Sequence, residues 1–275
     1  MMHSRINNFL TIDVEEWFQT VMFDNTGIKA VAGSDLEKNI SDIIALLDKY
    51  GTKATFFVVG SVAERHPSAV SQILKNGHEI ASHGYAHRLV YKMTPQEFEK
   101  DLDLSLGILK EVTGGEVLGY RACTWSITRD TPWALDTLKE RGLRYDSSIY
   151  PVNFYPFGRV KRFPYKIKDG LFEIPPSVFE AFGCHLPFGG GTFLRFLPLN
   201  FIKEKITRLN REGFPAVVYF HSWEAVDETP PDIRMSAWKR FIQYKNVGQV
   251  LGRVELLLKE FSFVPMRAFL NGQRF

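Results

Sequence analysis

The feature that most constrains the fold is a regular alternation of short apolar runs with amphipathic segments. Runs rich in β-branched and aromatic residues, which are typical of buried strands, cover residues 9–13, 53–59, 78–82, 117–121, 143–146, 172–174, 216–220 and 263–264. Helical spacing of apolar residues lies between them, at residues 36–50, 67–76, 94–113, 132–141, 198–211 and 238–261. This alternation predicts an α/β fold, with a parallel sheet covered by helices.

Residues at the segment ends support these boundaries. Thr94 with Glu97 matches a capping box, and Gly51 follows the first helix. We find no internal repeat, linker or low-complexity run, so we expect a single domain over residues 1–275. Residues 148–197 are rich in Pro, Gly and Phe and poor in helical patterns, and we expect a loop-rich insertion there.

The composition argues against some classes of protein. The chain is 45% hydrophobic with a net charge of +3, which allows a large core but is too little charge for a typical nucleic-acid binder. Cys123 and Cys184 form no Cys-x-x-Cys unit, so we expect neither a disulfide framework nor a zinc knuckle. There is no signal-peptide core and no apolar run of membrane-spanning length. We therefore expect a cytoplasmic protein without a transmembrane segment, with or without peripheral contact to the inner membrane face.

Reactive polar side chains stand where five of the predicted strands end. They are Asp13, His83, Arg121, Asp146 and His221. In an α/β barrel, chemistry collects at the C-terminal ends of the strands. We therefore expect these side chains to share one site.

His83 and His87 are the candidate metal ligands of this site. Imidazole is the commonest side-chain ligand near neutral pH, and a spacing of four residues brings two side chains onto one face of a helical turn. A carboxylate from residues 13–16 would complete a three-ligand site with open positions, as in catalytic zinc sites. The alternative is that both are ordinary surface or core histidines.

The other residues at the strand ends complete a set for metal-assisted hydrolysis of an acyl–nitrogen or acyl–oxygen bond. A metal-bound water has its pKa lowered to about 7, Asp13 or Glu15 can act as general base, and Arg121 can orient that base. His221 can protonate the leaving group. The alternatives are structural: the acids cap helices, Arg121 pairs with Asp146, and His221 is a hydrogen-bonded core residue.

Five segments carry a resemblance to a known family. They read Thr-Ile-Asp-Val-Glu at 11–15, Ser-His-Gly-Tyr-Ala-His at 82–87, Gly-Tyr-Arg-Ala-Cys at 119–123, Tyr-Asp-Ser-Ser-Ile at 145–149 and Val-Tyr-Phe-His at 218–221. In this order they resemble the five motifs of the polysaccharide deacetylase family, also called the NodB-homology or carbohydrate esterase family 4 group. The resemblance implies an incomplete, distorted (β/α) barrel of about seven strands.

The chain is most similar to a subgroup encoded with exopolysaccharide and exosortase loci. The shared features include Tyr-Phe-His-x-Trp-Glu, here at 219–224, and Gly-Gly-Gly-x-Phe, here at 189–193. The subgroup also carries a C-terminal helical extension, which we assign to residues 223–275. This resemblance implies a role in exopolysaccharide biosynthesis.

The resemblance also implies a role for each site residue. These are Asp13 as general base, His221 as general acid, His83 and His87 as metal ligands, Arg121 as the residue that steadies the base, and the backbone N–H of Thr124 as an oxyanion donor. Four aromatic residues flank the motifs and would stack on sugar rings, although core packing is the alternative for each: Trp17, Tyr85, Trp125 and Trp223.

Three positions depart from the family pattern. Val14 replaces the usual second Asp of the first motif, so we assign Glu15 as the third metal ligand, with Asp13 and Glu16 as alternatives. Cys123 stands where the third motif usually has Pro, which leaves a ligand, a reactive thiol or simple packing open. Asp146 lies in an atypical fourth motif, which leaves its role in tuning the general acid open.

The predicted function is a metal-dependent hydrolase that removes N-acetyl groups from N-acetylhexosamine units of a surface polysaccharide or its glycolipid precursor, with a metal-bound water as nucleophile. We expect one divalent ion, zinc before iron, cobalt or nickel, and no nucleic-acid partner. One alternative is a hydrolase of cyclic amides or imides, as in allantoinase-like relatives. The other is a catalytically inert glycan-binding barrel.

Overall fold

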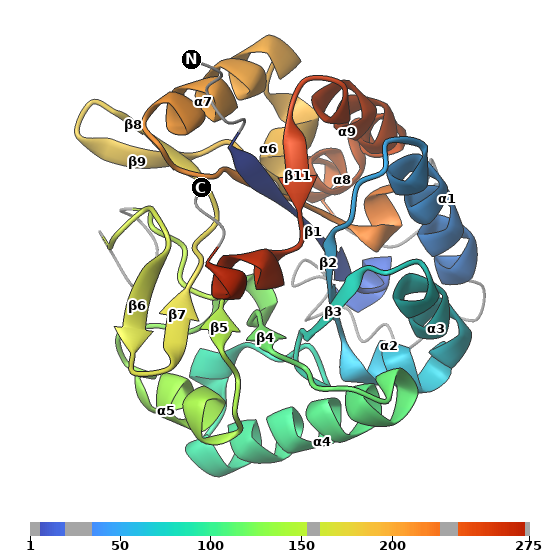
Figure 1. Ribbon diagram of the computed structural model, residues 1–275, viewed down its shortest axis with the longest axis vertical. Helices are drawn as coiled ribbons and strands as arrows, with labels where there is room; N and C mark the ends of the chain where they lie inside the picture. Colours follow the sequence, from blue (N-terminus) through green and yellow to red (C-terminus); the bar gives the residue numbers. More distant parts are fainter. Residues whose placement is uncertain (1–5, 20–34, 153–159, 226–235, 273–275) are drawn as a thin grey trace.

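The computed structural model describes residues 6–19, 35–152, 160–225 and 236–272. Within these residues a nine-stranded sheet curls around the centre, with helices along its outside (Figure 1). Its strands are β1 (Asn7–Val14), β2 (Thr55–Val58), β3 (Glu79–Ser82), β4 (Gly119–Tyr120), β5 (Tyr145–Asp146), β6 (Tyr165–Lys168), β7 (Leu171–Glu173), β10 (Val217–His221) and β11 (Ser262–Val264). The architecture is an α/β fold with a curled half-barrel sheet.

The strand order explains how distant motifs meet. The sheet runs β10-β1-β2-β3-β4-β5-β7-β6, and β11 also pairs with β1. Each neighbouring pair is parallel except β6–β7. The predicted alternation of strands and helices is therefore confirmed. Seven parallel strands from β10 to β7 form the main run in the described residues, and β6 and β11 extend the sheet beyond the number expected from the resemblance.

The described residues form nine α-helices, most of which lie along the outside of the sheet (Figure 1). They are α1 (Leu36–Lys49), α2 (Gly60–Arg65), α3 (Pro67–Lys75), α4 (Pro95–Thr113), α5 (Trp133–Glu140), α6 (Gly191–Phe196), α7 (Leu199–Arg211), α8 (Ala237–Tyr244) and α9 (Val250–Leu258). The predicted capping box begins α4, where Thr94 accepts from the backbone N–H of Glu97 and the Glu97 carboxylate accepts from that of Thr94. The sequence did not indicate the short helices α2 and α6.

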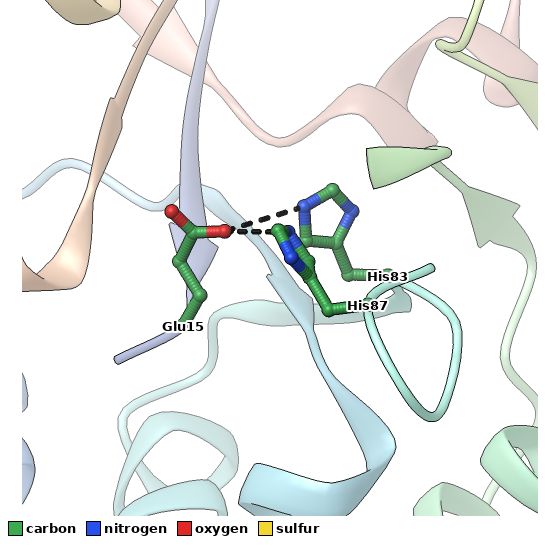
Figure 2. Close-up of side chains that lie close together, drawn as sticks. All are labelled: Glu15, His83 and His87. Atoms are coloured by element: carbon green, nitrogen blue, oxygen red, sulfur yellow. Dashed lines mark ion pairs between the residues drawn. The ribbon is translucent and has the colours of Figure 1, made fainter. Parts of the chain in front are cut away.

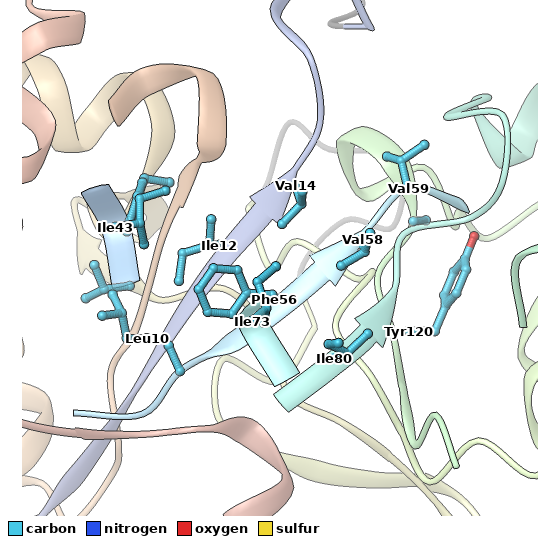
Figure 3. Close-up of a cluster of buried hydrophobic side chains, with 14 of the residues drawn as sticks. Leu10, Ile12, Val14, Ile43, Phe56, Val58, Val59, Ile73, Ile80 and Tyr120 are labelled. Carbon is cyan, nitrogen blue, oxygen red and sulfur yellow. The ribbon is translucent and has the colours of Figure 1, made fainter. Parts of the chain in front are cut away.

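Side-chain alternation along β1 separates the core from the site. Ile12 points outward and packs with Phe56 of β2, Ile43 of α1 and Ile73 of α3 in the main core cluster (Figure 3). Because successive strand residues point to opposite faces, Asp13 points to the interior of the curled sheet. The strand therefore anchors the fold with one face and positions a reactive carboxylate with the other.

The region expected to be a loop-rich insertion contains more regular structure than its composition suggests. Its described residues include β6, β7, α6 and a two-stranded hairpin, β8 (Val178–Ala181) with β9 (Cys184–Pro187). Of these, only the strand at 172–174 was predicted. The other strands were missed because they are stabilised by pairing with neighbouring strands and show no local sequence pattern.

The region assigned to a C-terminal extension joins the main fold. It contains α8, α9 and, between them, a 3-10 turn, η6 (Val247–Gln249), where the predicted helix is interrupted. Strand β11 lies beside the first residues of β1, and α9 buries Val250, Val254 and Leu257 in the main core. Residues 153–159, 226–235 and 273–275 of these two regions lie outside the described residues. None of the described helices combines the length and the apolar character needed to cross a bilayer.

Candidate active site

The histidine pair lies on a loop, not on a helical turn as we predicted. Residues after β3 are irregular, and Gly84 and His87 both have left-handed backbone conformations, with φ of +72° and +54°. Asp101 of α4 holds the loop by accepting from the backbone N–H groups of Tyr85 at 2.7 Å and Ala86 at 3.0 Å. This turn brings the ring centroids of His83 and His87 to 5.0 Å.

Backbone carbonyls set the tautomers of both histidines. His83 Nδ1 lies 2.7 Å from the carbonyl oxygen of Arg121, and His87 Nδ1 lies 2.7 Å from that of Gln19. A carbonyl can only accept, so each Nδ1 carries a proton and each Nε2 can act as a ligand. Burial lowers the pKa of His83 to about 4, which favours the neutral form that a metal requires.

Glu15 is the carboxylate that lies with the pair. Its Oε2 is 2.6 Å from His87 Nε2 and 4.0 Å from His83 Nε2 (Figure 2). The three donor atoms lie within 4.8 Å of one another, and all three side chains are at least 95% buried. Two imidazole nitrogens and one carboxylate suit a divalent transition metal. Glu16 instead pairs with Arg65, so the geometry favours Glu15 of the two.

Asp13 pairs with Arg121 inside the curled sheet. Arg121 is fully buried, and its Nη1 donates to Asp13 Oδ1 at 2.7 Å and to Thr11 Oγ1 at 3.0 Å. Its guanidinium also lies over the Phe57 ring, 4.1 Å from the centroid. A buried cation held in this way orients the Asp13 carboxylate. The alternative pairing of Arg121 with Asp146 is not among its contacts with described residues.

His221 lies at the end of β10, directly beside β1. Its Nδ1 is 2.8 Å from Glu224 Oε2, and the other oxygen of Glu224 is 2.6 Å from Arg195 Nε. Burial alone would lower the pKa of His221, but the charges of Glu224 and Glu15 outweigh it and raise the pKa to about 9. His221 therefore carries a proton at neutral pH, as a general acid must.

A cavity of about 260 Å³ brings most of the predicted residues together. Those that line it are Asp13, Glu15, His83, His87, Arg121, Thr124, Trp125, His221 and Trp223. Trp17 and Tyr85 are outside its lining, and the Tyr85 hydroxyl donates to Glu64 at 2.9 Å. Both residues are close to the motifs in the sequence, but the sequence could not show that they lie outside the cavity lining.

The two tryptophans of the cavity are mainly packed side chains. Trp125 is 8% exposed and its ring lies 4.8 Å from the rings of both Tyr150 and Tyr219. Trp223 is 9% exposed, stacks on His221 at 5.5 Å, and donates from Nε1 to Glu15 Oε1 at 3.0 Å. Trp223 therefore also orients the candidate metal ligand.

Thr124 lies in a strained segment of the cavity wall. Thr124 and Trp125 have φ values of +51° and +50°, which are unusual for residues with a Cβ and are often found at functional sites. The preceding residue, Cys123, is buried with its Sγ 3.5 Å from His87 Nδ1. Since that nitrogen faces away from the donor atoms, Cys123 contacts a ligand without joining the ligand set.

Asp146 lies outside the cavity lining and interacts with Glu173. Both carboxyls are fully buried, and Ser148 donates to Asp146. Burial raises the pKa of Asp146 to about 6, and burial together with the charge of Asp146 raises that of Glu173 well above its usual value. The carboxylate that contacts His221 is Glu224. Asp146 of the fourth motif therefore does not contact the residue that it was considered to tune.

Sequence reasoning missed Glu224, Arg195 and the role of the glycine run. The motif at 219–224 included Glu224, but no role was assigned to it. At Gly190 an added Cβ would lie 2.4 Å from the Tyr219 carbonyl oxygen. The run therefore allows the chain to approach β10 closely, beside His221.

Comparisons with known proteins match the two parts of the chain to different family models. Residues 19–145 match the model of the polysaccharide deacetylase family, and residues 147–271 match that of a domain of unknown function (DUF3473). A peptidoglycan deacetylase from Helicobacter pylori is 31% identical over 121 residues, 44% of this chain and 40% of that protein. A peptidoglycan-N-acetylglucosamine deacetylase from Bacillus cereus is 29% identical over 128 residues, 42% of this chain and 46% of that protein. The chain thus matches less than half the length of these curated relatives.

Solved structures extend the likeness over the whole chain. A putative polysaccharide deacetylase from Mycobacterium smegmatis has a TM-score of 0.62 at 21% identity, covering 100% of this chain and 94% of that one. The peptidoglycan deacetylase PdaC from Bacillus subtilis has a TM-score of 0.52 at 13% identity, covering 98% and 91%. At such identities the structures show the fold alone. Residues 19–145 thus match the polysaccharide deacetylase family model, and the chain shares the fold of these solved deacetylase structures.

Proposed function

We propose that this protein is a metal-dependent N-deacetylase acting on N-acetylhexosamine units of a surface polysaccharide or its precursor. The observation that carries the proposal is the single cavity lined by the Glu15–His83–His87 cluster, the Asp13–Arg121 pair and the His221–Glu224 pair. The relatives described as peptidoglycan deacetylases support the same reaction.

Glu15, His83 and His87 would hold the metal, with zinc as the proposed ion. Their donor set and the fixed tautomers fit a divalent cation, and three protein ligands leave positions open. A bound cation would supply Lewis-acid activation of water and of the acetamide carbonyl.

The remaining residues would move the protons. Asp13, oriented by Arg121 through Oδ1, accepts the proton of the attacking water. His221 donates its Nε2 proton to the leaving amine while Glu224 holds its Nδ1, so the C–N bond breaks and acetate is released. The backbone N–H of Thr124 would donate to the oxyanion as charge develops.

Acetate release from N-acetylglucosamine oligomers and from peptidoglycan tests this function. The protein is loaded in turn with zinc, cobalt, nickel or iron, and allantoin serves as a cyclic amide probe. We expect Asp13→Asn and His83→Ala to lose activity, and Glu16→Gln to keep it, because Glu16 is held by Arg65 outside the cluster. Unchanged activity in Asp13→Asn, or turnover of allantoin alone, would refute the proposal.

A further inference from the structure

We propose that Phe196, Trp238 and Phe241, here called the aromatic platform, bind further sugar units of the glycan whose N-acetylated unit occupies the cavity. This inference rests on the function proposed above, and it makes the substrate a chain of several sugars. The platform lies on α6 and α8, in the part of the chain that matches the domain of unknown function.

The platform combines exposed rings with an ordered arrangement. Trp238 is 68% exposed, Phe241 46% and Phe196 37%. The rings of Trp238 and Phe241 are nearly parallel, with centroids 6.0 Å apart and an interplanar angle of 17°, and Phe196 meets Phe241 edge-on at 5.4 Å. Contiguous exposed aromatic side chains mark binding surfaces. Flat apolar rings of this kind match the C–H faces of pyranose sugars.

The platform continues from the wall of the cavity. Ile242 and Gln243 of α8 line the cavity, as does Arg195, which precedes Phe196 on α6. Trp238 and Ile242 are four residues apart on one helix, so their side chains share a face. A glycan leaving the cavity along α8 would therefore meet the rings of the platform.

One buried side chain fixes the platform relative to the general acid. Arg195 donates to the carbonyl oxygens of Ile242 at 3.0 Å, Gln243 at 3.0 Å and Lys245 at 2.9 Å, which are acceptors left over at the end of α8. Its Nε also pairs at 2.6 Å with Glu224, the residue that holds His221. A subsite needs this fixed spacing to place the scissile bond at the reacting groups.

A lipid surface is the other binding partner that exposed aromatic side chains suggest. Basic residues at α8 are Lys239, Arg240 and Lys245, fewer than the roughly four to eight that anionic lipid-binding segments carry. The helix has eight residues and would span only about 12 Å. Continuity with the cavity therefore favours the glycan.

Binding to a non-hydrolysing protein tests the platform. Titration calorimetry would compare N-acetylglucosamine with its β-1,4-linked hexamer, using zinc-loaded Asp13→Asn protein. We expect the hexamer to bind at least tenfold more tightly than the monomer. Adding Trp238→Ala and Phe241→Ala should weaken the hexamer about tenfold and leave the monomer unchanged. Phe182→Ala, at a fully exposed ring on the β8–β9 turn, is the matched control and should change neither.

Kinetics with Asp13 intact give a second readout. The double variant should raise KM for the hexamer with kcat retained, which a folding defect would not do. Equal hexamer affinity with and without the platform rings, including no binding by either protein, would overturn the inference. The inference would also be overturned if the double variant lost only the ability of the protein to sediment with phosphatidylglycerol vesicles. If the wild type and the double variant release acetate equally from oligomers of every length, the platform proposal is refuted and the proposed function is not. If binding depends on the rings but no acetate is released, the proposed function is refuted and the platform proposal is not.

Discussion

Substitutions of single buried charges should strongly affect the stability of this site. Arg121 and Asp13 form a pair in which both side chains are at least 97% buried. Replacing one member of a buried pair leaves the other charge uncompensated, which costs about 3–5 kcal/mol. We expect Arg121→Met to lose that much unfolding free energy in urea titrations. Arg141→Met, which breaks a more exposed contact with Asp103, should cost at most about 1 kcal/mol. Equal losses in the two variants would argue against the pair.

The Asp146–Glu173 pair predicts a pH dependence of stability. Both pKa values are raised in the folded protein, to about 6 for Asp146, so the folded state keeps a proton that the unfolded chain releases near pH 4. Stability is therefore lost as pH rises from about 4 through 6 and beyond. Glu173→Gln mimics the protonated acid, because its amide can donate to Asp146. Between pH 5 and pH 8 the free energy of unfolding of the wild type should fall by on the order of 2 kcal/mol more than that of this variant.

Urea unfolding at the two pH values measures that difference. Glu180→Gln, on the more exposed strand β8, is the control, and its free energy of unfolding should fall as much as that of the wild type between the two pH values. A Glu173→Gln protein with the wild-type pH dependence would contradict the shared proton.

Residue chemistry was more predictable than residue pairing. Asp13, His83, Arg121 and His221 were expected at one site because each stands at the end of a predicted strand, and parallel strands end at one edge. The contact of Glu224 with His221 could not be predicted, because it depends on the 3-10 turn η5 (Ser222–Ala225) bringing the carboxylate back onto the ring.

Elements with a strong local pattern were predicted, and those that depend on contacts were not. The apolar stripe of α1 and the capping box of α4 are readable from the chain itself. The turn at residues 83–87 was read as helical from its spacing, whereas Gly84 and the carboxylate of Asp101 hold it in another conformation. A spacing of four residues therefore predicted the proximity of the pair but not its backbone.

The glycine run before α6 predicts a stability effect at the scale of an element. In Gly190→Ala the new Cβ would lie 2.2 Å from the Tyr219 ring and 2.4 Å from its carbonyl oxygen. Since the carbonyl belongs to β10, the strand or the run must shift. We expect a loss of about 1–3 kcal/mol, measured by thermal unfolding. Gly107→Ala, in open space on α4, should be neutral or stabilising by up to about 1 kcal/mol. A neutral Gly190→Ala would contradict the close approach.

Metal binding should stabilise the whole molecule, because the cluster joins the end of β1 to the loop after β3. Zinc at 100 times its Kd would add about 2.7 kcal/mol, enough to raise Tm by about 5 °C or more. Thermal scans with zinc and with a chelator would measure this. His87→Ala and Glu15→Gln should lose the shift, while His66→Ala, at a histidine outside the cluster, should keep it. A shift that survives in Glu15→Gln would remove that residue from the ligand set.

The sheet unites the two halves that the family models separate. Strand β1 precedes the first matched part, β2 to β4 and Tyr145 of β5 lie within it, and β6, β7, β10 and β11 lie within the second. The second half supplies neighbours on both sides, β10 beside β1 and β7 beside β5. The alternation of elements could predict a parallel sheet, but the return of β10 and β11 to β1 depends on contacts more than 200 residues apart in sequence.

This arrangement predicts one cooperative folding unit. A piece comprising residues 1–146 would expose both edges of its sheet and would lack His221, the proposed general acid. Exposed edges with unpaired backbone groups favour aggregation. We expect the full chain to unfold in a single calorimetric transition whose van't Hoff and calorimetric enthalpies agree. The shortened piece should show neither a cooperative transition nor protected amides in hydrogen exchange. Two separate transitions in the full chain, or a cooperatively folded N-terminal piece, would show instead that the two halves are independent domains, and the shared cavity would then require their docking rather than their common sheet.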